Sequence, residues 1–268
     1  MIKLTDQEFI TLVNFIKSNY GINLINKRVL LEGRLGNYLI ERGILSYSDY
    51  LKLLENDTTG KEVGILLTRV TTNHTYFMRE AEHFAYFKNT VLPQLESRIT
   101  DRDLRLWCAA SSTGEEPYTL AMILEDYFGA SPGWNKQMLA SDISSKVIEL
   151  AQAGVYHADS LKELPASWKT KYFTKIDESS FQITPKLRKE VVFRLNNLME
   201  PFRFKRPFHA IFCRNVMIYF DAPTKADLVN RMYDILVPGG YLFIGHTESV
   251  AKPTRFNYIM PSVYQKGV

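Results

Sequence analysis

Residues 104–122, LRLWCAASSTGEEPYTLAM, decide the fold of this chain. The segment begins as an apolar run typical of a buried strand, and it ends as the start of a helix whose first turn tolerates Pro117. Between the two lies a turn with one glycine and two acids, Gly114, Glu115 and Glu116. A strand, a glycine turn and a helix, in that order, build the ligand sites of open α/β sheets.

This turn lacks both common phosphate-binding patterns. A dinucleotide fingerprint needs three glycines, and a P-loop needs a glycine followed by lysine and then serine or threonine. The turn instead presents carboxylates, which would repel a pyrophosphate. The sequence therefore favours a ligand that carries positive charge and no phosphate.

After about residue 100, strands and helices alternate along the chain. We predict helices at 115–128, 144–153 and 223–237, and strands at 104–110, 136–143, 191–197, 208–215 and 240–246. Pro238-Gly239-Gly240 should end the last of these helices. Such alternation is typical of an α/β protein with a mostly parallel sheet and helices on both faces. A late strand or hairpin within 256–267 predicts an antiparallel edge.

Two parts of the chain depart from this alternation. Residues 1–72 contain helical patterns alone, the first of which begins at Thr5 and ends at Gly21, so we predict a small all-α domain there. Residues 155–190 combine polar helix-like stretches with a short hairpin-like piece. We interpret them as a small β subdomain inserted in the second domain, residues 73–268.

The composition narrows the class of protein. The 268 residues carry a formal net charge of +4, which is too small to indicate a nucleic-acid-binding protein. No apolar run approaches the roughly 18 residues of a membrane span, and the polar start lacks the apolar core of a signal peptide. We therefore expect a cytoplasmic protein without membrane insertion.

Neither the cysteines nor the histidines indicate a metal site. Cys108 and Cys213 both lie in apolar, strand-like runs, where cysteine is usually a small buried hydrophobic residue. The histidines show no zinc-type spacing with the cysteines or with one another; they are His74, His83, His157, His209 and His246. We therefore expect no metal.

Polar side chains follow three of the predicted strands, at the edge where open α/β sheets bind ligands. Asp142 closes one strand, Asn197 follows another, and Arg214 with Asn215 follows a third. A carboxylate such as Asp142 can accept from both hydroxyls of a ribose, although it could instead cap the next helix. Glu115 could likewise be only a first-turn acid that the helix dipole favours. Together, an acidic turn and a ribose-binding acid indicate a cationic ligand with an adenosine, such as S-adenosylmethionine.

Six motifs follow one another along the chain: TTNHTYFMRE, WCAASSTGEEPYTLAM, LASDIS, RLNNLM, IFCRNVMIYF and PGGYLFIGHTES. Together they resemble the CheR family, the chemotaxis receptor methyltransferases, and the resemblance covers essentially the whole chain. It implies a class I S-adenosylmethionine-dependent methyltransferase with a Rossmann-like α/β fold, preceded by an all-α domain that docks the receptor. It also implies a protein-glutamate O-methyltransferase that acts on the cytoplasmic helical region of methyl-accepting chemotaxis receptors.

The resemblance assigns roles to residues of these motifs. It implies that the cofactor is bound by Asn73, Thr75, Arg79, Glu115, Asp142, Asn197, Leu198, Arg214 and Asn215. It places Arg79 and Tyr219 near the methyl-transfer centre as catalytic residues. Arg79 could instead form a surface ion pair with Glu80 or Glu82. Tyr219 could instead be a core residue with a satisfied hydroxyl, and His246 is expected to be structural.

The implied reaction needs no general base. A glutamate side chain has a pKa of about 4.3, so it is ionised at pH 7 and can attack the methyl carbon directly, with S-adenosylhomocysteine as the product. Catalysis should then depend on positioning and desolvation of the carboxylate. The lack of a Ser/His/Asp or Cys/His pattern agrees with this reaction.

Two other functions fit parts of the sequence. A methyltransferase for some other carboxylate, such as a small molecule, would not need a helical docking domain. A non-catalytic module that only senses S-adenosylmethionine would be favoured if the motifs were eroded, and they are intact.

Two parts of the chain, the second N-terminal helix and the inserted hairpin, are candidates for contact with a receptor. Lys27 and Arg34 should share one face of the second N-terminal helix and attract an acidic receptor. The inserted hairpin has no glycine for a tight turn and contains Pro185, so we do not expect it to bind a receptor C-terminal pentapeptide, as some members of the family do. The protein is expected to be a monomer.

Overall fold

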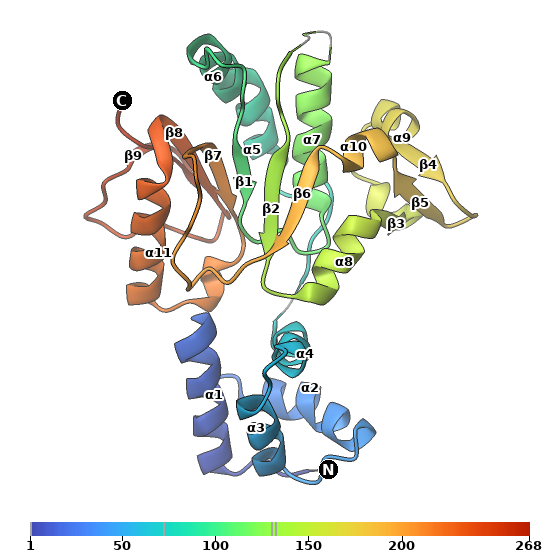
Figure 1. Ribbon diagram of the computed structural model, residues 1–268, viewed down its shortest axis with the longest axis vertical. Helices are drawn as coiled ribbons and strands as arrows, with labels where there is room; N and C mark the ends of the chain where they lie inside the picture. The colour runs from blue at the N-terminus through green and yellow to red at the C-terminus, as the bar shows by residue number, and fades with distance from the viewer. Residues whose placement is uncertain (1, 72, 130, 132) are drawn as a thin grey trace.

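The computed structural model describes residues 2–71, 73–129, 131 and 133–268, and it has two parts (Figure 1). The N-terminal part, below the sheet in the figure, contains α1 Asp6–Tyr20, α2 Arg28–Glu41, α3 Tyr47–Glu55 and α4 Lys61–Val70. Thr5 caps α1 in a capping box with Glu8, and Gly21 ends this helix with φ of 72°. The small helical bundle is therefore built from the local signals that predict it.

The basic pair expected on α2 does not share one exposed face of the helix. Lys27 is exposed but lies outside the helix, at its N-cap. Arg34 is half-buried, and its Nη1 donates to the carbonyl oxygens of Arg69 (3.1 Å) and Thr71 (2.8 Å) at the end of α4. Arg34 is therefore not on a fully exposed face, because spacing gives the azimuth of a side chain but not the neighbour that covers it, and receptor docking through this pair stays a prediction. Arg34 instead holds α2 against the C-terminus of α4.

The C-terminal part is built on a seven-stranded sheet with the order β6-β2-β1-β7-β8-β10-β9. Its strands are β1 Leu106–Cys108, β2 Met138–Asp142, β6 Val191–Leu195, β7 Phe208–Cys213, β8 Leu236–Ile244, β9 Asn257–Met260 and β10 Val263–Gln265. The strands from β6 to β8 in this order pair in parallel, whereas β10 is antiparallel to both β8 and β9. The predicted mostly parallel sheet with an antiparallel edge hairpin is confirmed.

Helices cover the sheet: α5 Ala81–Tyr86, the π-helix η1 Phe87–Val91, α6 Leu92–Arg98, α7 Glu115–Phe128, α8 Ser145–Ala153 and α11 Ala222–Asp234. No sequence pattern predicted α5, η1 or α6. In the described part of the chain, no helix combines the length and the apolar character that crossing a membrane requires.

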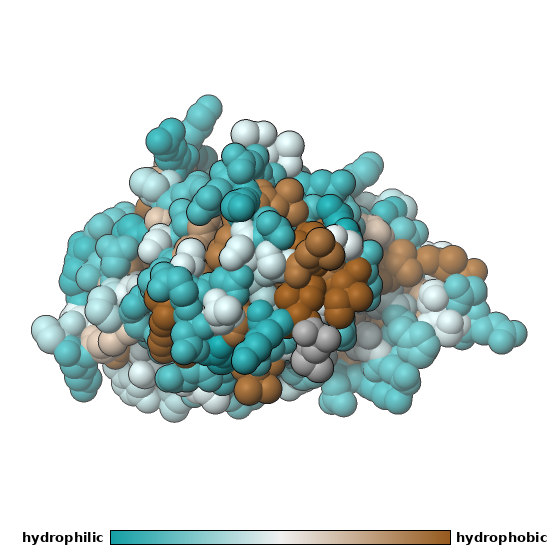
Figure 2. Space-filling view, turned by 90° about the horizontal axis from the view of Figure 1, so that it is seen from below, coloured by the Kyte–Doolittle hydropathy of each residue, from teal (hydrophilic) through white to brown (hydrophobic). Residues whose placement is uncertain are grey.

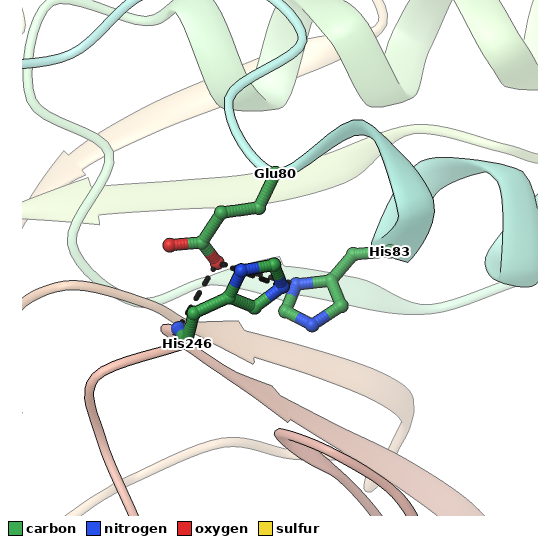
Figure 3. Close-up of side chains that lie close together, drawn as sticks. All are labelled: Glu80, His83 and His246. Atoms are coloured by element: carbon green, nitrogen blue, oxygen red, sulfur yellow. Dashed lines mark hydrogen bonds and ion pairs between the residues drawn. The ribbon is translucent and has the colours of Figure 1, made fainter.

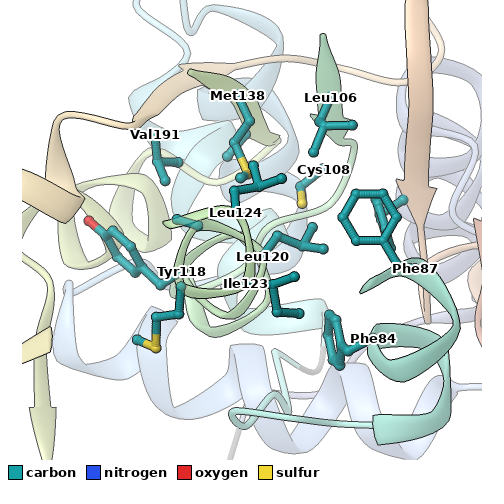
Figure 4. Packing of buried hydrophobic residues seen from close by; sticks show 14 of the residues in the cluster. Phe84, Phe87, Leu106, Cys108, Tyr118, Leu120, Ile123, Leu124, Met138 and Val191 are labelled. Atoms are coloured by element: carbon teal, nitrogen blue, oxygen red, sulfur yellow. The ribbon is translucent and has the colours of Figure 1, made fainter. Parts of the chain in front are cut away.

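Each face of the sheet has its own hydrophobic core, because successive residues of β1 point to opposite sides. Leu106 and Cys108 pack with α5, η1 and α7, as Figure 4 shows. Trp107 faces the other side, where one continuous cluster joins the sheet and α11 to the helical domain. The helical domain and the sheet therefore share a core. Cys108 and Cys213 are both fully buried, as predicted.

The glycines of the PGG motif kink a strand and do not end a helix. The helix α11 stops at Asp234, and β8 already begins at Leu236, before Pro238-Gly239-Gly240. The register between β7 and β8 shifts near Phe208, and such an irregularity tolerates a proline inside a sheet. Gly239 takes φ of 72°, a left-handed conformation that suits glycine. The predicted end of the helix at residue 237 is therefore wrong.

The inserted subdomain is a three-stranded antiparallel sheet with the order β3-β5-β4. Its elements are β3 Val155–His157, η2 Ala158–Leu161, α9 Ala166–Tyr172, β4 Phe173–Lys175, β5 Ser180–Ile183 and α10 Pro185–Arg188. Asp126 of α7 anchors it by accepting from Trp168 Nε1 (2.7 Å) and Lys171 Nζ (2.6 Å).

The hairpin of this subdomain closes without a glycine. Asp177 accepts from the backbone N–H groups of Ser179 and Ser180, each at 2.8 Å, and so forms the β4–β5 turn. Pro185 is the first residue of α10 and removes no donor from a strand. Both reasons given against peptide binding are thus wrong, and β4 is an edge strand. That the hairpin binds no receptor tail peptide stays a prediction, which saturable micromolar binding in a titration would contradict.

Candidate functional site

A cleft opens beyond the carboxyl ends of β1, β2, β6 and β7, where the strand order reverses between β1 and β7. It holds about 970 Å³ of empty space, part of which is open to solvent. Its walls come from the segment after α4, from the ends of the four strands, and from Tyr20 and Ile22 of the helical domain. This size suits a ligand as large as a nucleoside derivative.

Most of the predicted site residues line this cleft. They are Asn73, Thr75, Arg79, Asp142, Asn197, Leu198, Arg214, Asn215 and Tyr219. These residues are far apart in the sequence, and the carboxyl edge of the parallel sheet brings them together, as their positions at strand ends predict.

The structure does not bring Glu115 to the cleft. Its carboxylate is buried elsewhere, where Oε2 accepts from the hydroxyl of Thr113 at 2.7 Å, and burial raises the pKa of Glu115. The neighbouring Glu116 lines the cleft in its place. Successive residues of a helix point about 100° apart, so only one of two adjacent acids can face a given site. The structure thus places Glu116 and not Glu115 at the cleft, and the role of either acid in binding the cofactor stays a prediction.

Asp142 lies at the end of β2 and is held by backbone amides. Its Oδ2 accepts from the N–H of Ser112 (2.9 Å), and its Oδ1 accepts from the N–H of Ser144 (3.1 Å). Burial raises the pKa of Asp142, and these hydrogen bonds oppose the rise. The helix cap of α8 is the hydroxyl of Ser144, so the alternative role of Asp142 is filled by another residue. Each carboxylate oxygen keeps a lone pair for a ligand.

Two asparagines follow β6 at the cleft. Asn197 already uses both ends of its amide, since Nδ2 donates to the carbonyl of Asn19 (2.8 Å) and Oδ1 accepts from the N–H of Met199 (3.0 Å). Asn196 was missed in the sequence, although it stands in the same motif. Its Nδ2 is buried and has no hydrogen-bond partner among the described residues. An unpaired buried donor beside a cleft points to an acceptor on a ligand.

Arg214 lies between two carboxylates, with a side chain that is 2% exposed. Its Nη2 is 3.1 Å from Oε2 of Glu80, and its Nη1 makes a short ion pair with Glu116. The other oxygen of Glu80 accepts from Nδ2 of Asn215 at 3.1 Å. Burial raises the pKa of Glu116 although Arg214 opposes it. For Glu80, hydrogen bonds and the charge of Arg214 outweigh burial and lower the pKa.

Arg79 and Tyr219 face the cleft from two different segments. Nη1 of Arg79 donates to the carbonyl of His74 at 2.7 Å, and the ion pairs of the described residues include none between Arg79 and Glu80. The carbonyl of Tyr219 accepts from the N–H of Asn23 at 2.8 Å. This bond ties the helical domain to the edge of the cleft.

Glu248 holds the two loops that border this side of the cleft, a role that no sequence pattern predicted. It is 8% exposed and has no ion-pair partner in the described part of the chain. Its Oε2 accepts from the N–H groups of Asn215 (3.0 Å) and Gly245 (2.6 Å), and its Oε1 accepts from that of Ile218 (3.2 Å). Burial raises the pKa of Glu248, and these bonds oppose the rise. Glu248 therefore positions Asn215, which takes a left-handed φ of 58°.

Replacing Glu248 with glutamine should weaken cofactor binding about tenfold, which is about 1.4 kcal/mol. An amide has an N–H₂ group at one end, so at least one backbone N–H now faces a donor and the loop loses its anchor. Calorimetry with S-adenosylmethionine measures the effect. The matched control is Glu125→Gln, which changes a buried carboxylate of α7 that is paired with Lys136 (2.8 Å) and does not line the cleft. Unchanged affinity in Glu248→Gln, or an equal loss in the control, would remove the positioning role.

Comparison with known proteins extends over both parts of the molecule. Residues 73–264 match the family described as CheR methyltransferase, SAM binding domain, and residues 7–71 match CheR methyltransferase, all-alpha domain. The chain is 39% identical to the chemotaxis protein methyltransferase of Borreliella burgdorferi, over 99% of this chain and 96% of that protein. It is 37% identical to the chemotaxis protein methyltransferase of Escherichia coli, over 94% of this chain and 87% of that protein. With both family regions present and in order, the chain belongs to the CheR family of methyltransferases.

Proposed function

We propose that this protein is a protein-glutamate O-methyltransferase, which transfers the methyl group of S-adenosylmethionine to glutamate side chains of methyl-accepting chemotaxis receptors. The observation that carries this proposal is the cleft that gathers Asp142, Glu116 and Arg214 at the switch point of the sheet, in a chain of the CheR family. The product of the cofactor would be S-adenosylhomocysteine.

The residues of the cleft fit this cofactor. Asp142 can accept from ribose hydroxyls, the unpaired amide of Asn196 can donate to an acceptor of the purine, and Leu198 supplies an apolar surface for the ring. The carboxylates of Glu116 and Glu80 outnumber the guanidinium between them, which favours a cationic ligand. When bound, the cofactor supplies a methyl group on a positively charged sulfur.

The protein contributes position more than acid–base chemistry. A substrate glutamate with a pKa of about 4.3 is ionised at neutral pH, so no residue has to remove a proton. Arg79 is a guanidinium with fixed donors at the rim of the cleft and can orient the incoming carboxylate. Tyr219 lies on the same lining and can exclude water from the reacting groups.

We assign receptor docking to the helical domain. Figure 2 looks at the molecule from the side of this domain and shows hydrophobic side chains gathered within a hydrophilic surface. Exposed large hydrophobic residues of the domain include Ile25, Val29, Ile40 and Leu45. Such a surface suits a helical protein partner, and a small-molecule substrate would not need it. The protein would then work as a monomer in the cytoplasm, next to the cytoplasmic helices of the receptor.

Transfer of a tritiated methyl group tests the proposal. Purified cytoplasmic domains of chemotaxis receptors are incubated with the protein and labelled S-adenosylmethionine, and the label is then released by base as methanol. Glutamate methyl esters release methanol under these conditions, whereas methylated amines do not. Label found only on small carboxylic acids, or binding of the cofactor without any transfer, would overturn the receptor assignment.

Replacing Arg79 with alanine should abolish most methyl transfer and leave the fold intact, because its side chain lines the cleft and its hydrogen bond to the carbonyl of His74 is exposed. Arg79→Lys should not restore full activity, since a point charge lacks the planar fork of a guanidinium. The kinetics of receptor methylation measure both variants. Arg255→Ala is the matched control, because Arg79 lies over the ring of Tyr76 and Arg255 lies over the ring of Tyr233, but Arg255 does not line the cleft. Full activity in Arg79→Ala would exclude the role.

A further inference from the structure

Glu80, His83 and His246 come together beside the cofactor cleft, as Figure 3 shows. Each offers one possible ligand atom for a metal ion, and these atoms all lie within 4.8 Å of one another. Glu80 and His83 belong to the start of α5, whereas His246 follows β8. None of the three lines the cleft itself.

His83 lacks the partner that a buried imidazole needs. It is 0% exposed, and neither of its ring nitrogens has a hydrogen-bond partner among the described residues. Neutral imidazole is the form that binds a metal ion. A ligand on one ring nitrogen would remove part of the cost of burying this ring unpaired.

The distances between the ligand atoms suit a small divalent ion. Nδ1 of His83 lies 3.5 Å from Oε2 of Glu80, and Nε2 of His246 lies 3.9 Å from the same oxygen. Ligands bound to tetrahedral zinc at about 2.0–2.1 Å are about 3.3 Å apart, so the side chains would have to close by up to about 1.5 Å to bring these atoms onto one ion. The exposed side chain of Glu82, whose Oε1 lies 3.5 Å from Nε2 of His246, would have to turn toward the other two residues to supply a fourth ligand.

Charge and access also favour a cation. Glu80, Glu82 and Glu116 are three carboxylates near one guanidinium, that of Arg214, so this group of side chains has an excess of negative charge. The side chains of His246 and Glu82 are 37% and 61% exposed, which opens a route from solvent to the buried His83. Arg214 lies 3.1 Å from the shared oxygen of Glu80 and lowers the affinity by like-charge repulsion.

We propose that Glu80, His83 and His246, with Glu82 as a fourth ligand, form a binding site for a divalent transition-metal ion of the zinc type. Two imidazoles with carboxylates are ligands that zinc prefers, whereas magnesium and calcium prefer oxygen alone. The ion would join the start of α5 to the loop after β8 and would compete with Arg214 for the oxygen of Glu80. The site shares Glu80 with the ion pairs that border the cleft, but binding of a metal ion can be measured without methyl transfer.

The test titrates tag-free, EDTA-treated full-length protein with Zn²⁺ and, separately, with Mg²⁺ near neutral pH, by calorimetry. We expect one Zn²⁺ per chain and no saturable Mg²⁺ binding. His246→Ala should bind Zn²⁺ at least about tenfold more weakly. The matched control is His157→Ala, which removes an exposed histidine 3.3 Å from the carboxylate of Asp159 and should leave the affinity unchanged.

Two further measurements separate loss of the metal site from loss of the fold. Thermal melting of the metal-free proteins shows whether His246→Ala is folded; if it is not, Glu82→Ala, at an exposed position, replaces it and should also weaken binding. Bound Co²⁺ should give the visible absorption of a tetrahedral nitrogen and oxygen site in the unmodified protein and lose it in the variant. No saturable Zn²⁺ binding, or equal binding in the folded variant, would overturn the site.

Discussion

Replacing Arg214 with methionine should lower the free energy of unfolding by about 3–5 kcal/mol and abolish cofactor binding. Removal of one partner of a buried ion pair leaves an uncompensated buried charge, which is the source of this cost. Here two carboxylates, Glu80 and Glu116, lose the guanidinium that lies between them. Urea denaturation measures the stability, and calorimetry with S-adenosylmethionine measures the binding.

The loss of stability in Arg214→Met should shrink at acid pH. Burial already raises the pKa of Glu116, and without the guanidinium the pKa values of Glu116 and Glu80 both rise. A carboxylate whose folded pKa exceeds its unfolded value destabilises the fold in full above the folded pKa. This penalty disappears as the pH falls to the unfolded value of about 4.3. Denaturation at neutral and at acid pH should therefore give different losses.

Arg206→Met is the matched control for this prediction. Arg206 also bridges two carboxylates, Asp101 at 2.6 Å and Asp103 at 2.7 Å, but its side chain is 54% exposed. An exposed ion pair contributes about 0–1 kcal/mol, so this variant should lose little stability and no cofactor affinity. Equal losses in the two variants would show that burial of Arg214 is not what matters.

Replacing Asp142 with alanine should weaken binding of S-adenosylmethionine by about 1.5–3 kcal/mol, or roughly 10- to 150-fold. This is the scale of a hydrogen bond to a charged group, and the carboxylate of Asp142 faces the cleft at the end of β2. Calorimetric titration measures the affinity. Unchanged affinity would show that the ribose is bound elsewhere.

Asp142 also accepts from backbone amides, so its control must lose a similar bond. Asp221 caps α11 by accepting from the N–H of Thr224 at 3.1 Å, and it does not line the cleft. Asp221→Ala should therefore lose about 1 kcal/mol of stability and keep its affinity for the cofactor. A fall in affinity in both variants would show that losing a carboxylate bound to backbone N–H groups weakens cofactor binding wherever it lies, and that Asp142 has no specific role.

The site residues at strand ends could be predicted because a parallel sheet places all its carboxyl ends at one edge. Asp142 and Arg214 follow apolar strand runs, and that position alone sends them to the cleft. The choice between Glu115 and Glu116 could not be made in this way. Both acids stand in the first turn of one helix, and only the packing of α7 decides which of them faces the ligand.

Contacts between loops that are distant in the sequence could not be predicted from local sequence patterns. Glu248 binds amides of the loop after β7, and His246 meets His83 across the fold. Neither pairing follows from residue spacing, because tertiary structure alone brings these segments together. The end of the last helix was predicted wrongly from the PGG motif for a related reason. A proline and two glycines can end a helix or kink a strand, and here the pairing of β8 with β7 decides that they kink a strand.

The hydrophobic cluster that joins one face of the sheet to the helical domain means that the two parts of the chain do not fold independently. Because Trp107 of β1 and the buried leucines of α2 belong to the same cluster, one face of the sheet completes the hydrophobic core of the helical domain. Heating should consequently melt the chain in a single cooperative transition. A helical domain transplanted from a relative would need a sheet surface of matching shape to bury its apolar side chains.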